Sequence, residues 1–365
     1  MNILVLCLSD GKGGLEHYIA KLAHYVKQTG HSLTLCTKRG TDLDKLLAGE
    51  PGEKLYLERI STYFPVLCAR KLARFIDQHK VDHLFINWGA DLPLAAMAKA
   101  MSKQQPKLIY SRHMKIPKDK RDIYHNWVYS KVDLLLTITE QVRAEALRHL
   151  PLRQQQIKNC YLGVAKPSAE PDNCQAVRKS LGMPADGFLV ALFGRIEKAK
   201  GQHILIEATR ILKQRNVLLH TAIIGHVMDD DYYTNLVETI KNNDLSEQIT
   251  LLDFIPAPMA IMPCFDVITL TTIEETFGLV LVEAMRCGVA VIGSRAGGVK
   301  EIIDEGICGL MFESGNPEAL ADALQDLYTD VAKREKFAIE GKAKADRMFD
   351  QDTHFKQLMQ LLSQA

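Results

Sequence analysis

Two glutamates, Glu275 and Glu283, have seven residues between them, in a segment that predicts the end of a strand and the start of a helix. The apolar run 267–270 is typical of a buried strand, and apolar residues at helical spacing follow from about Gly278. Glu275 is therefore expected just outside the helix and Glu283 more than one turn inside it, where side chains lean back toward the N-terminus. Both carboxylates can converge on a ligand held at the helix start.

The same helix start predicts a phosphate site. The first backbone N–H groups of a helix have no partner within it, and the helix dipole favours an anion there. A carboxylate beside a diphosphate is repelled unless it accepts hydrogen bonds from hydroxyl groups, so the predicted ligand carries phosphates flanked by sugars. The alternatives are a dipole-complementing acid at Glu275 and an ordinary surface residue at Glu283. The predicted donor amides belong to Phe277, Gly278, Leu279 and Val280.

Two cations follow another predicted strand. Arg195 comes directly after the apolar run 188–193 and its glycine, and Lys200 stands five residues later, before the glycine that precedes the next helix. Arginine can hold phosphate oxygens through its planar fork, while lysine acts as a compact charge. The pair therefore suits a diphosphate, and the alternative is two solvated surface cations.

The N-terminal half offers weaker signals. Gly13 and Gly14 lie in a glycine-rich turn between the first strand and the first helix, where backbone can approach a ligand closely. This turn lacks the G-x-G-x-x-G spacing of dinucleotide sites, and a tight turn that requires glycine explains it equally well. His113 follows the predicted strand 107–111, and the alternative there is a polar residue satisfied by its neighbours.

Strands and helices alternate along the chain, which predicts an α/β protein of two Rossmann-like, doubly wound domains with a cleft between them. A stretch rich in proline and glycine after Gly163 marks the linker. The expected division is an acceptor-binding domain over 1–163, a nucleotide-sugar-binding domain over 164–345 and a C-terminal helix over 346–365 that packs back on the first domain. Predicted strands cover 2–8, 31–37, 81–87, 107–111, 188–193, 218–224, 249–252, 267–270 and 289–292.

Composition points to an ordinary globular protein. The 365 residues are 47% hydrophobic and 24% charged, which excludes disordered and collagen-like chains. The apolar runs are too short to span a bilayer, and no signal peptide is recognisable. The eight cysteines are scattered singly without a C-x-x-C pair, so a reduced, cytoplasmic protein is expected.

Charge is distributed unevenly. Residues 1–163 contain 25 Lys and Arg against 15 Asp and Glu, whereas residues 164–365 contain 20 against 29. Within residues 99–158 the excess of positive charge is +8, and Tyr124, Trp127 and Tyr129 lie among these cations. Basic and aromatic residues together suit an anionic membrane surface or an acidic glycan, so a peripheral position at the inner face of the membrane is expected. A solvated basic face is the alternative.

Several segments resemble the retaining glycosyltransferases of the GT-B fold. The two glutamates of ETFGLVLVEAM resemble the family's carboxylate signature, and GRIEKAKG resembles its phosphate-binding segment. GGLEHY resembles its N-terminal glycine loop, and VDLLLTITE, IKNCYLGV and RAGGVKEII occupy the usual places. The chain departs from the pattern at Thr276, where many relatives have glycine, and at Gly225, the one glycine in a turn that is usually rich in them.

The resemblance implies roles for these residues. Glu283 would bind the ribose of a nucleotide, Glu275 the donor sugar, Arg195 and Lys200 the diphosphate, and His113 would lie beside the donor sugar. The implied activity is sugar transfer with retention, without a metal or cofactor, from a UDP- or GDP-type sugar donor to a glycan or lipid-linked acceptor in envelope polysaccharide or lipopolysaccharide synthesis. No nucleic acid partner is expected. The alternatives are a nucleotide-sugar epimerase and a non-catalytic sugar-nucleotide-binding protein.

Overall fold

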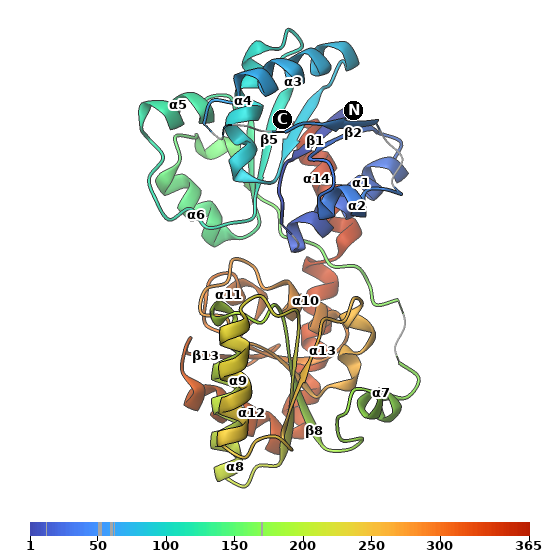
Figure 1. The fold of residues 1–365 in the computed structure, drawn as a ribbon, viewed down its shortest axis with the longest axis vertical. Helices are drawn as coiled ribbons and strands as arrows, with labels where there is room; N and C mark the ends of the chain where they lie inside the picture. Colours follow the sequence, from blue (N-terminus) through green and yellow to red (C-terminus); the bar gives the residue numbers. More distant parts are fainter. Residues whose placement is uncertain (12, 50–52, 59–60, 62, 169–170) are drawn as a thin grey trace. The chain divides into compact units, whose positions relative to one another are not determined.

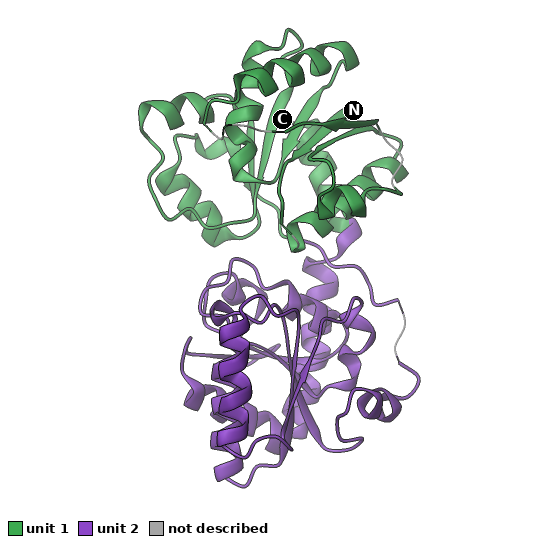
Figure 2. Ribbon diagram, in the orientation of Figure 1, with its two compact units in different colours: residues 1–161, 353–365 green, residues 162–352 purple. Residues whose placement is uncertain are grey.

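The protein forms two compact units, shown in different colours in Figure 2. Unit 1 comprises residues 1–161 and 353–365, and unit 2 comprises residues 162–352, whereas the sequence places the divisions after residues 163 and 345. No helix in the described ranges has both the length and the apolar character needed to span a bilayer. The structure is a computed structural model that describes residues 1–11, 13–49, 53–58, 61, 63–168 and 171–365.

Unit 1 contains a parallel sheet of seven described strands in the order β3-β2-β1-β4-β5-β6-β7 (Figure 1). Helices α1 and α2 contact each other, as do α3 and α4. The elements are β1 (Asn2–Cys7), α1 (Gly14–Gln28), β2 (Ser32–Thr37), α2 (Asp42–Leu46), β3 (Glu53–Tyr56), α3 (Val66–His79), β4 (His83–Ile86), η1 (Gly89–Asp91), α4 (Leu92–Met101), β5 (Lys107–Arg112), α5 (Ile123–Tyr129), β6 (Leu134–Thr137), α6 (Glu140–His149), η2 (Gln154–Gln156), β7 (Ile157–Asn159) and α14 (Gln351–Ser363).

Unit 2 contains a second parallel sheet, with six described strands in the order β10-β9-β8-β11-β12-β13. Helix α8 contacts α9 and α12, while α10 contacts α13. The elements are α7 (Cys174–Ser180), β8 (Phe188–Phe193), η3 (Lys198–Lys200), α8 (Gln202–Gln214), β9 (Leu219–Ile224), α9 (Asp230–Asn242), β10 (Ile249–Leu252), η4 (Pro258–Ala260), η5 (Met262–Cys264), β11 (Val267–Leu270), α10 (Leu279–Arg286), β12 (Ala290–Ser294), α11 (Val299–Ile302), β13 (Leu310–Phe312), α12 (Pro317–Thr329) and α13 (Val331–Met348).

The hydrophobic pattern explains why these elements form. All six residues of β8 are buried, as are five of the six in β1. Such continuous apolar runs suit parallel strands that are covered on both faces. Helix α1 buries Ile19, Leu22 and Val26 at helical spacing and ends just before Gly30, whose φ of +74° favours glycine. The predicted α/β class with two doubly wound domains is therefore confirmed.

The longer strands are predicted from the sequence, whereas several short ones are not. The predicted ranges for β8, β10 and β11 agree with the structure at both ends. The short strands β3, β6, β7 and β13 are not predicted by the pattern, because three or four residues carry little periodic signal and β3 and β7 also contain charged residues. From Pro317 to Ser363 the chain is almost entirely helical, in α12, α13 and α14.

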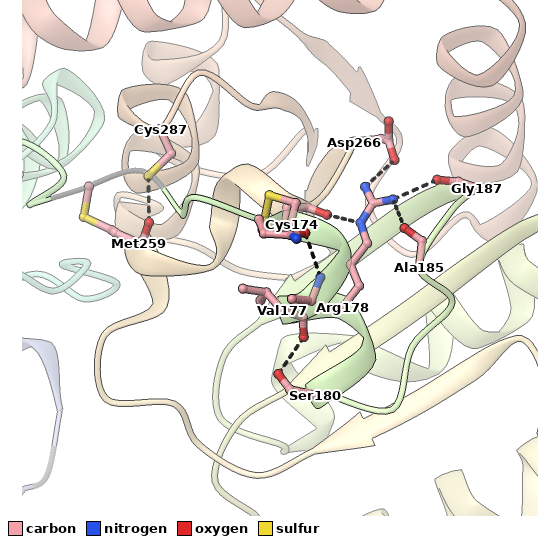
Figure 3. Close-up of a disulfide and its surroundings, with 12 residues drawn as sticks. Cys174, Val177, Arg178, Ser180, Ala185, Gly187, Met259, Asp266 and Cys287 are labelled. Carbon is pink, nitrogen blue, oxygen red and sulfur yellow. Dashed lines mark hydrogen bonds and ion pairs between the residues drawn. A yellow bond between two sulfur atoms is a disulfide. The ribbon is translucent and has the colours of Figure 1, made fainter.

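One expectation about the cysteines is wrong. Cys174, at the start of α7, forms a disulfide with Cys264 at the end of η5, with 90 residues of sequence between these positions (Figure 3). Their Cα atoms are 4.9 Å apart, a separation that only the fold produces. Spacing along the chain carries no sign of this pair, so the expectation of a fully reduced chain fails at these two residues.

Arg178 holds the same helix by a second set of contacts. Its Nε donates to the Cys264 carbonyl at 2.7 Å, and its Nη1 donates to the carbonyls of Ala185 and Gly187, both at 3.3 Å (Figure 3). Its Nη2 forms an ion pair with Asp266 at 3.4 Å. Helix α7 is therefore attached to unit 2 by a covalent bond and by one arginine.

We expect Cys174→Ser to lower the free energy of unfolding by about 2–4 kcal/mol under oxidising conditions while the fold is kept. The disulfide restricts the unfolded chain over a long loop, and the Arg178 contacts still hold α7 when the disulfide is absent. Denaturant titration with and without excess reductant measures this. Wild type and variant should become equally stable in reductant, and a remaining difference there would contradict the explanation.

Candidate functional site

The strand order reverses between β1 and β4 in unit 1 and between β8 and β11 in unit 2. In open parallel sheets, ligands bind at the carboxyl ends of strands next to such a reversal. The residues singled out from the sequence follow three of these four strands. Arg195 and Lys200 follow β8, Glu275 follows β11, and the glycine turn with Gly13 follows β1.

In unit 2 the loop after β8 is fixed against the end of β11. Gly201 has a φ of +71°, and a Cβ atom there would lie 2.3 Å from the Thr271 carbonyl oxygen, so no larger residue fits. The Thr271 hydroxyl donates to the carbonyls of Lys200 and Gly201, at 2.8 and 2.9 Å. These contacts hold Lys200 beside the segment that carries Glu275.

Lys200 and Glu275 form an ion pair, with Nζ and Oε2 3.3 Å apart. Their side chains are 24% and 17% exposed, so water screens the pair only in part. The other carboxylate oxygen of Glu275 accepts from the Thr276 N–H at 3.0 Å. The Glu275 carbonyl lies against Gly297, where a Cβ would come within 1.6 Å of it. The backbone of Glu275 is thus fixed by a close approach that only glycine allows.

Arg195 lies on the same loop as Lys200 but has a different partner. Its Nη2 forms an ion pair with Glu197 at 2.8 Å, and its side chain is half exposed. Its carbonyl accepts from the side-chain amide of Gln202, the first residue of α8. The loop after β8 therefore presents two cations, of which Lys200 is joined to the β11 side and Arg195 is more accessible.

The helix predicted after Glu275 is α10, which begins at Leu279 with Gly278 as its N-cap. Gly278 has a φ of +103°, and a Cβ there would press on the side chain of Leu270 at 3.3 Å. Phe277 is buried, whereas Leu279 and Val280 are partly exposed, so the first turn of the helix is partly accessible. The N–H groups of a first turn point along the helix axis, and the helix dipole makes this end attractive to an anion.

Glu283 lies in the second turn of α10 and is partly exposed. It stands four residues after Leu279, so the two share a face of the helix. Helical side chains lean toward the N-terminus, so a glutamate in the second turn is within reach of a ligand at the start of α10. Unit 2 thus contains Arg195, Lys200, Glu275, Phe277–Val280 and Glu283, as the sequence analysis expects of a donor site.

Unit 1 contains the other predicted site residues. Gly13 is the N-cap of α1, and its N–H donates to the Glu16 carboxylate at 3.0 Å. Glu16 is only 3% exposed and also accepts from the Ser9 hydroxyl at 2.8 Å. This buried carboxylate holds the turn that leads to Gly14, while Lys12 of the same turn lies outside the described residues.

His113 follows β5 and is enclosed. Its Nε2 lies 3.0 Å from the Ser111 hydroxyl and 3.3 Å from the amide nitrogen of Asn87, which follows β4. Burial lowers the pKa of His113 to about 3, with smaller contributions from the positive charges of His354 and Arg112. The imidazole is therefore neutral at pH 7, so at this pH it acts as a hydrogen-bonding group and carries no charge.

Three residues around His113 were missed by the sequence analysis. Tyr18 of α1 packs edge-on against the His113 ring, with ring centroids 4.9 Å apart, and its hydroxyl lies 3.1 Å from Nε2 of His354 in α14. Asn87 could have been found, because it directly follows an apolar strand. Tyr18 carries only the weak signal of standing in the helix after the glycine turn, and His354 carries none, because its place depends on how α14 packs.

No group of three or more His, Cys, Asp or Glu side chains in the described part of the chain is arranged to hold a metal ion. The consecutive acids at 229–231 belong to the start of α9, where Asp229 caps the helix by accepting from the Tyr232 N–H at 3.0 Å. These three acids therefore belong to a helix start.

Both halves of the chain match family models of glycosyltransferases. Residues 174–344 match the family described as "Glycosyl transferases group 1", and residues 12–165 match the one described as "Glycosyltransferase Family 4". A D-inositol 3-phosphate glycosyltransferase of Pseudarthrobacter chlorophenolicus is 28% identical over 251 residues, which are 68% of this chain. The match spans 59% of that relative's length.

Solved structures share the whole fold. HepE of Anabaena in complex with UDP has a TM-score of 0.88 at 23% identity, and the match covers 100% of both chains. The lipopolysaccharide outer core galactosyltransferase WaaB has a TM-score of 0.77 at 14% identity, again covering 100% of both chains. Both family models describe glycosyltransferases and together match most of the chain, so the chain belongs to the glycosyltransferases of the two-domain GT-B fold.

Proposed function

We propose that the protein transfers a sugar from a nucleotide diphosphate sugar, held mainly by unit 2, to an acceptor held by unit 1. The observation that carries this proposal is the arrangement of Lys200, Glu275 and the start of α10 next to the strand reversal of unit 2. A cation, a carboxylate and a helix N-terminus together suit a ligand with both phosphates and hydroxyl groups.

The donor would be held by complementary charge. Arg195, Lys200 and the amides of residues 277–280 would bind the diphosphate, and Glu283 would accept hydrogen bonds from the ribose. Lys200 now pairs with Glu275. A bound diphosphate would compete for this lysine and leave the carboxylate to accept from hydroxyls of the donor sugar.

The same groups would promote the reaction. As the bond to the sugar breaks, negative charge grows on the leaving diphosphate while the sugar becomes like an oxocarbenium ion. Fixed cations and helix N–H groups stabilise this charge without reorganising. We propose that the acceptor hydroxyl attacks from the face that the diphosphate leaves, which retains the configuration. His113 would lie beside the donor sugar as a neutral hydrogen-bonding group, because its pKa of about 3 excludes a proton-donating role at pH 7.

Uridine diphosphate sugars are the first donors to test, because the HepE structures contain UDP and UDP-glucose. The decisive experiment follows release of UDP from UDP-glucose, with and without acceptor, alongside thermal unfolding in the presence of UDP-, GDP- and ADP-sugars. A donor that binds the folded protein raises its apparent stability. Isomerised sugar from donor alone would indicate an epimerase. Stabilisation by a donor that is neither hydrolysed nor transferred would indicate a non-catalytic binding protein.

The acceptor is proposed to be anionic. An open hollow of about 340 Å³ in unit 1, beside the carboxyl end of β2, is lined by Arg39 and by two ion pairs, Lys38 with Asp10 at 2.7 Å and Lys45 with Asp42 at 4.0 Å. Relatives are named for an inositol phosphate acceptor and solved neighbours for lipopolysaccharide synthesis. We therefore propose a phosphorylated glycan or lipid-linked acceptor in the synthesis of an envelope polysaccharide or lipopolysaccharide, with the enzyme in the cytoplasm at the inner face of the membrane.

Excess chelator is expected to leave the transfer rate almost unchanged. In the proposed mechanism, Arg195, Lys200 and the start of α10 supply the positive charge that a divalent cation supplies in other enzymes. The measurement compares UDP release before and after treatment with EDTA, with magnesium and manganese added back separately. Loss of activity that either metal restores would contradict this mechanism.

A further inference from the structure

Unit 1 exposes an unusual group of large apolar side chains. Phe64 is 67% exposed, Leu67 75% and Ile123 91%, while Tyr63 and Trp127 are also exposed. We call these five residues the apolar patch. Contiguous apolar surface of this kind on a soluble chain usually marks a binding site for a protein or a membrane.

Contacts of Tyr124 show that the two segments of the apolar patch, residues 63–67 and 123–127, lie together. Tyr124 of α5 packs edge-on against the rings of Tyr63 and Phe64, with centroids 5.9 and 5.6 Å apart. Its hydroxyl donates to the Tyr63 carbonyl at 2.9 Å. Ile123 and Trp127 stand four residues apart and therefore share a face of α5. The segment that leads into α3 and helix α5 are therefore in direct contact, and each exposes large apolar side chains.

Cations surround the apolar patch. Arg70 and Lys71 are exposed in the first turns of α3, and Lys120 and Arg121 directly precede α5. Lys131 lies over the Trp127 ring, with Nζ 5.8 Å from its centroid. The acids close by have partners of their own, since Asp119 pairs with Arg121 and Asp122 pairs with His125 while capping α5. The rim of the apolar patch is therefore positively charged.

We propose that the apolar patch is the surface by which unit 1 docks on a bilayer of anionic phospholipids. The apolar side chains would enter the region between headgroups and acyl chains, and the cations around them would contact the phosphates. This pattern of aromatic and aliphatic residues rimmed by lysine and arginine is typical of interfacial membrane binding, whereas protein interfaces are depleted in lysine. The proposal rests on the proposed function, because docking would bring unit 1 to a lipid-linked acceptor.

The test uses the full-length protein and sedimentation with vesicles. Wild type should pellet with vesicles that contain phosphatidylglycerol and remain in solution with pure phosphatidylcholine. Ile123→Glu should weaken binding at least tenfold. Its matched control is Ile339→Glu, on the exposed face of α13 in unit 2, which should bind as wild type does. The pair Lys120→Glu and Arg121→Glu should reduce binding most at low salt, whereas Lys336→Glu on α13 should not.

Two readouts separate this proposal from the function on which it rests. UDP release from UDP-glucose in the absence of vesicles should be equal in wild type and Ile123→Glu, because this residue touches no donor-site residue described above. If the wild-type protein releases UDP normally but does not bind vesicles, only the docking proposal is wrong. If the wild-type protein binds vesicles but transfers no sugar, only the proposed function is wrong.

Folding and self-association provide the remaining controls. Thermal unfolding checks that Ile123→Glu is folded, and Leu67→Glu, on the other segment of the apolar patch, repeats the measurement independently. Analytical ultracentrifugation tests whether the apolar patch instead binds a second copy of the chain. The proposal is overturned if either substitution leaves vesicle binding unchanged in a folded protein, or if wild type forms a dimer that Ile123→Glu dissociates without affecting vesicle binding.

Discussion

Lys200→Ala should lower the rate of sugar transfer by about 10²–10³-fold, and Arg195→Ala by a similar factor, corresponding to roughly 2–4 kcal/mol of transition-state stabilisation. Both residues belong to the loop after β8, where the leaving diphosphate would gain charge, and Lys200 contacts Glu275, which precedes α10. Single-turnover transfer with a saturating UDP-sugar donor measures the effect. Saturation separates a slower chemical step from weaker binding.

The matched control is Lys198→Ala. Lys198 lies on the same 3-10 turn as Lys200 and carries the same charge, but its side chain is exposed. We expect its variant to transfer sugar at nearly the wild-type rate. If Lys200→Ala and Arg195→Ala transfer sugar within a factor of two of the wild-type rate, these residues do not stabilise the leaving diphosphate.

A double-mutant cycle on the donor-free protein examines the Lys200–Glu275 pair directly. Because the two side chains are in contact before the donor binds, the effects of Lys200→Ala and Glu275→Gln on the free energy of unfolding should not add, and a coupling of about 0.5–3 kcal/mol is expected. Additive effects would mean that the ion pair does not stabilise the donor-free site.

Substitution of the two carboxylates should affect different quantities, donor affinity for one and transfer rate for the other. Glu283→Ala should raise the dissociation constant of the donor by about 10- to 100-fold, because it would remove hydrogen bonds between a carboxylate and the ribose. Glu275→Ala should chiefly lower the rate of transfer, by about 10²-fold, because its carboxylate would contact the reacting sugar. Calorimetric titration with the donor and single-turnover kinetics measure the two quantities separately.

Glu274→Ala is the control for this division, because Glu274 is the exposed neighbour of Glu275 on the same loop. It should change neither quantity by more than about twofold. Equal losses of donor affinity in Glu283→Ala and Glu275→Ala would show that both carboxylates bind the same part of the donor.

Much of the donor half follows from the sequence, because its signals are local. The apolar runs of β8 and β11 are continuous, so their ends, and hence the positions of Arg195 and Glu275, can be read from the pattern. Gly278 marks the start of α10 because a helix that begins with a left-handed residue favours glycine there. The functional roles of these residues remain predictions.

The surroundings of His113 show the limit of that approach. The sequence indicates a histidine at the end of β5, but its neutral state follows from burial, and burial depends on packing. Tyr18 and His354 are 336 residues apart in sequence and meet only because α14 belongs to unit 1. No local propensity encodes such a contact.

What the sequence alone determined is the alternation of strands and helices, the two doubly wound domains and the placing of the charged residues just after strands, since periodicity and turn residues act over a few neighbours. Only the tertiary structure decided that Lys200 pairs with Glu275, that Cys174 bonds to Cys264, and that two separate segments form the apolar patch. These contacts join residues far apart in the chain, and the packing of the helices and sheets selects them.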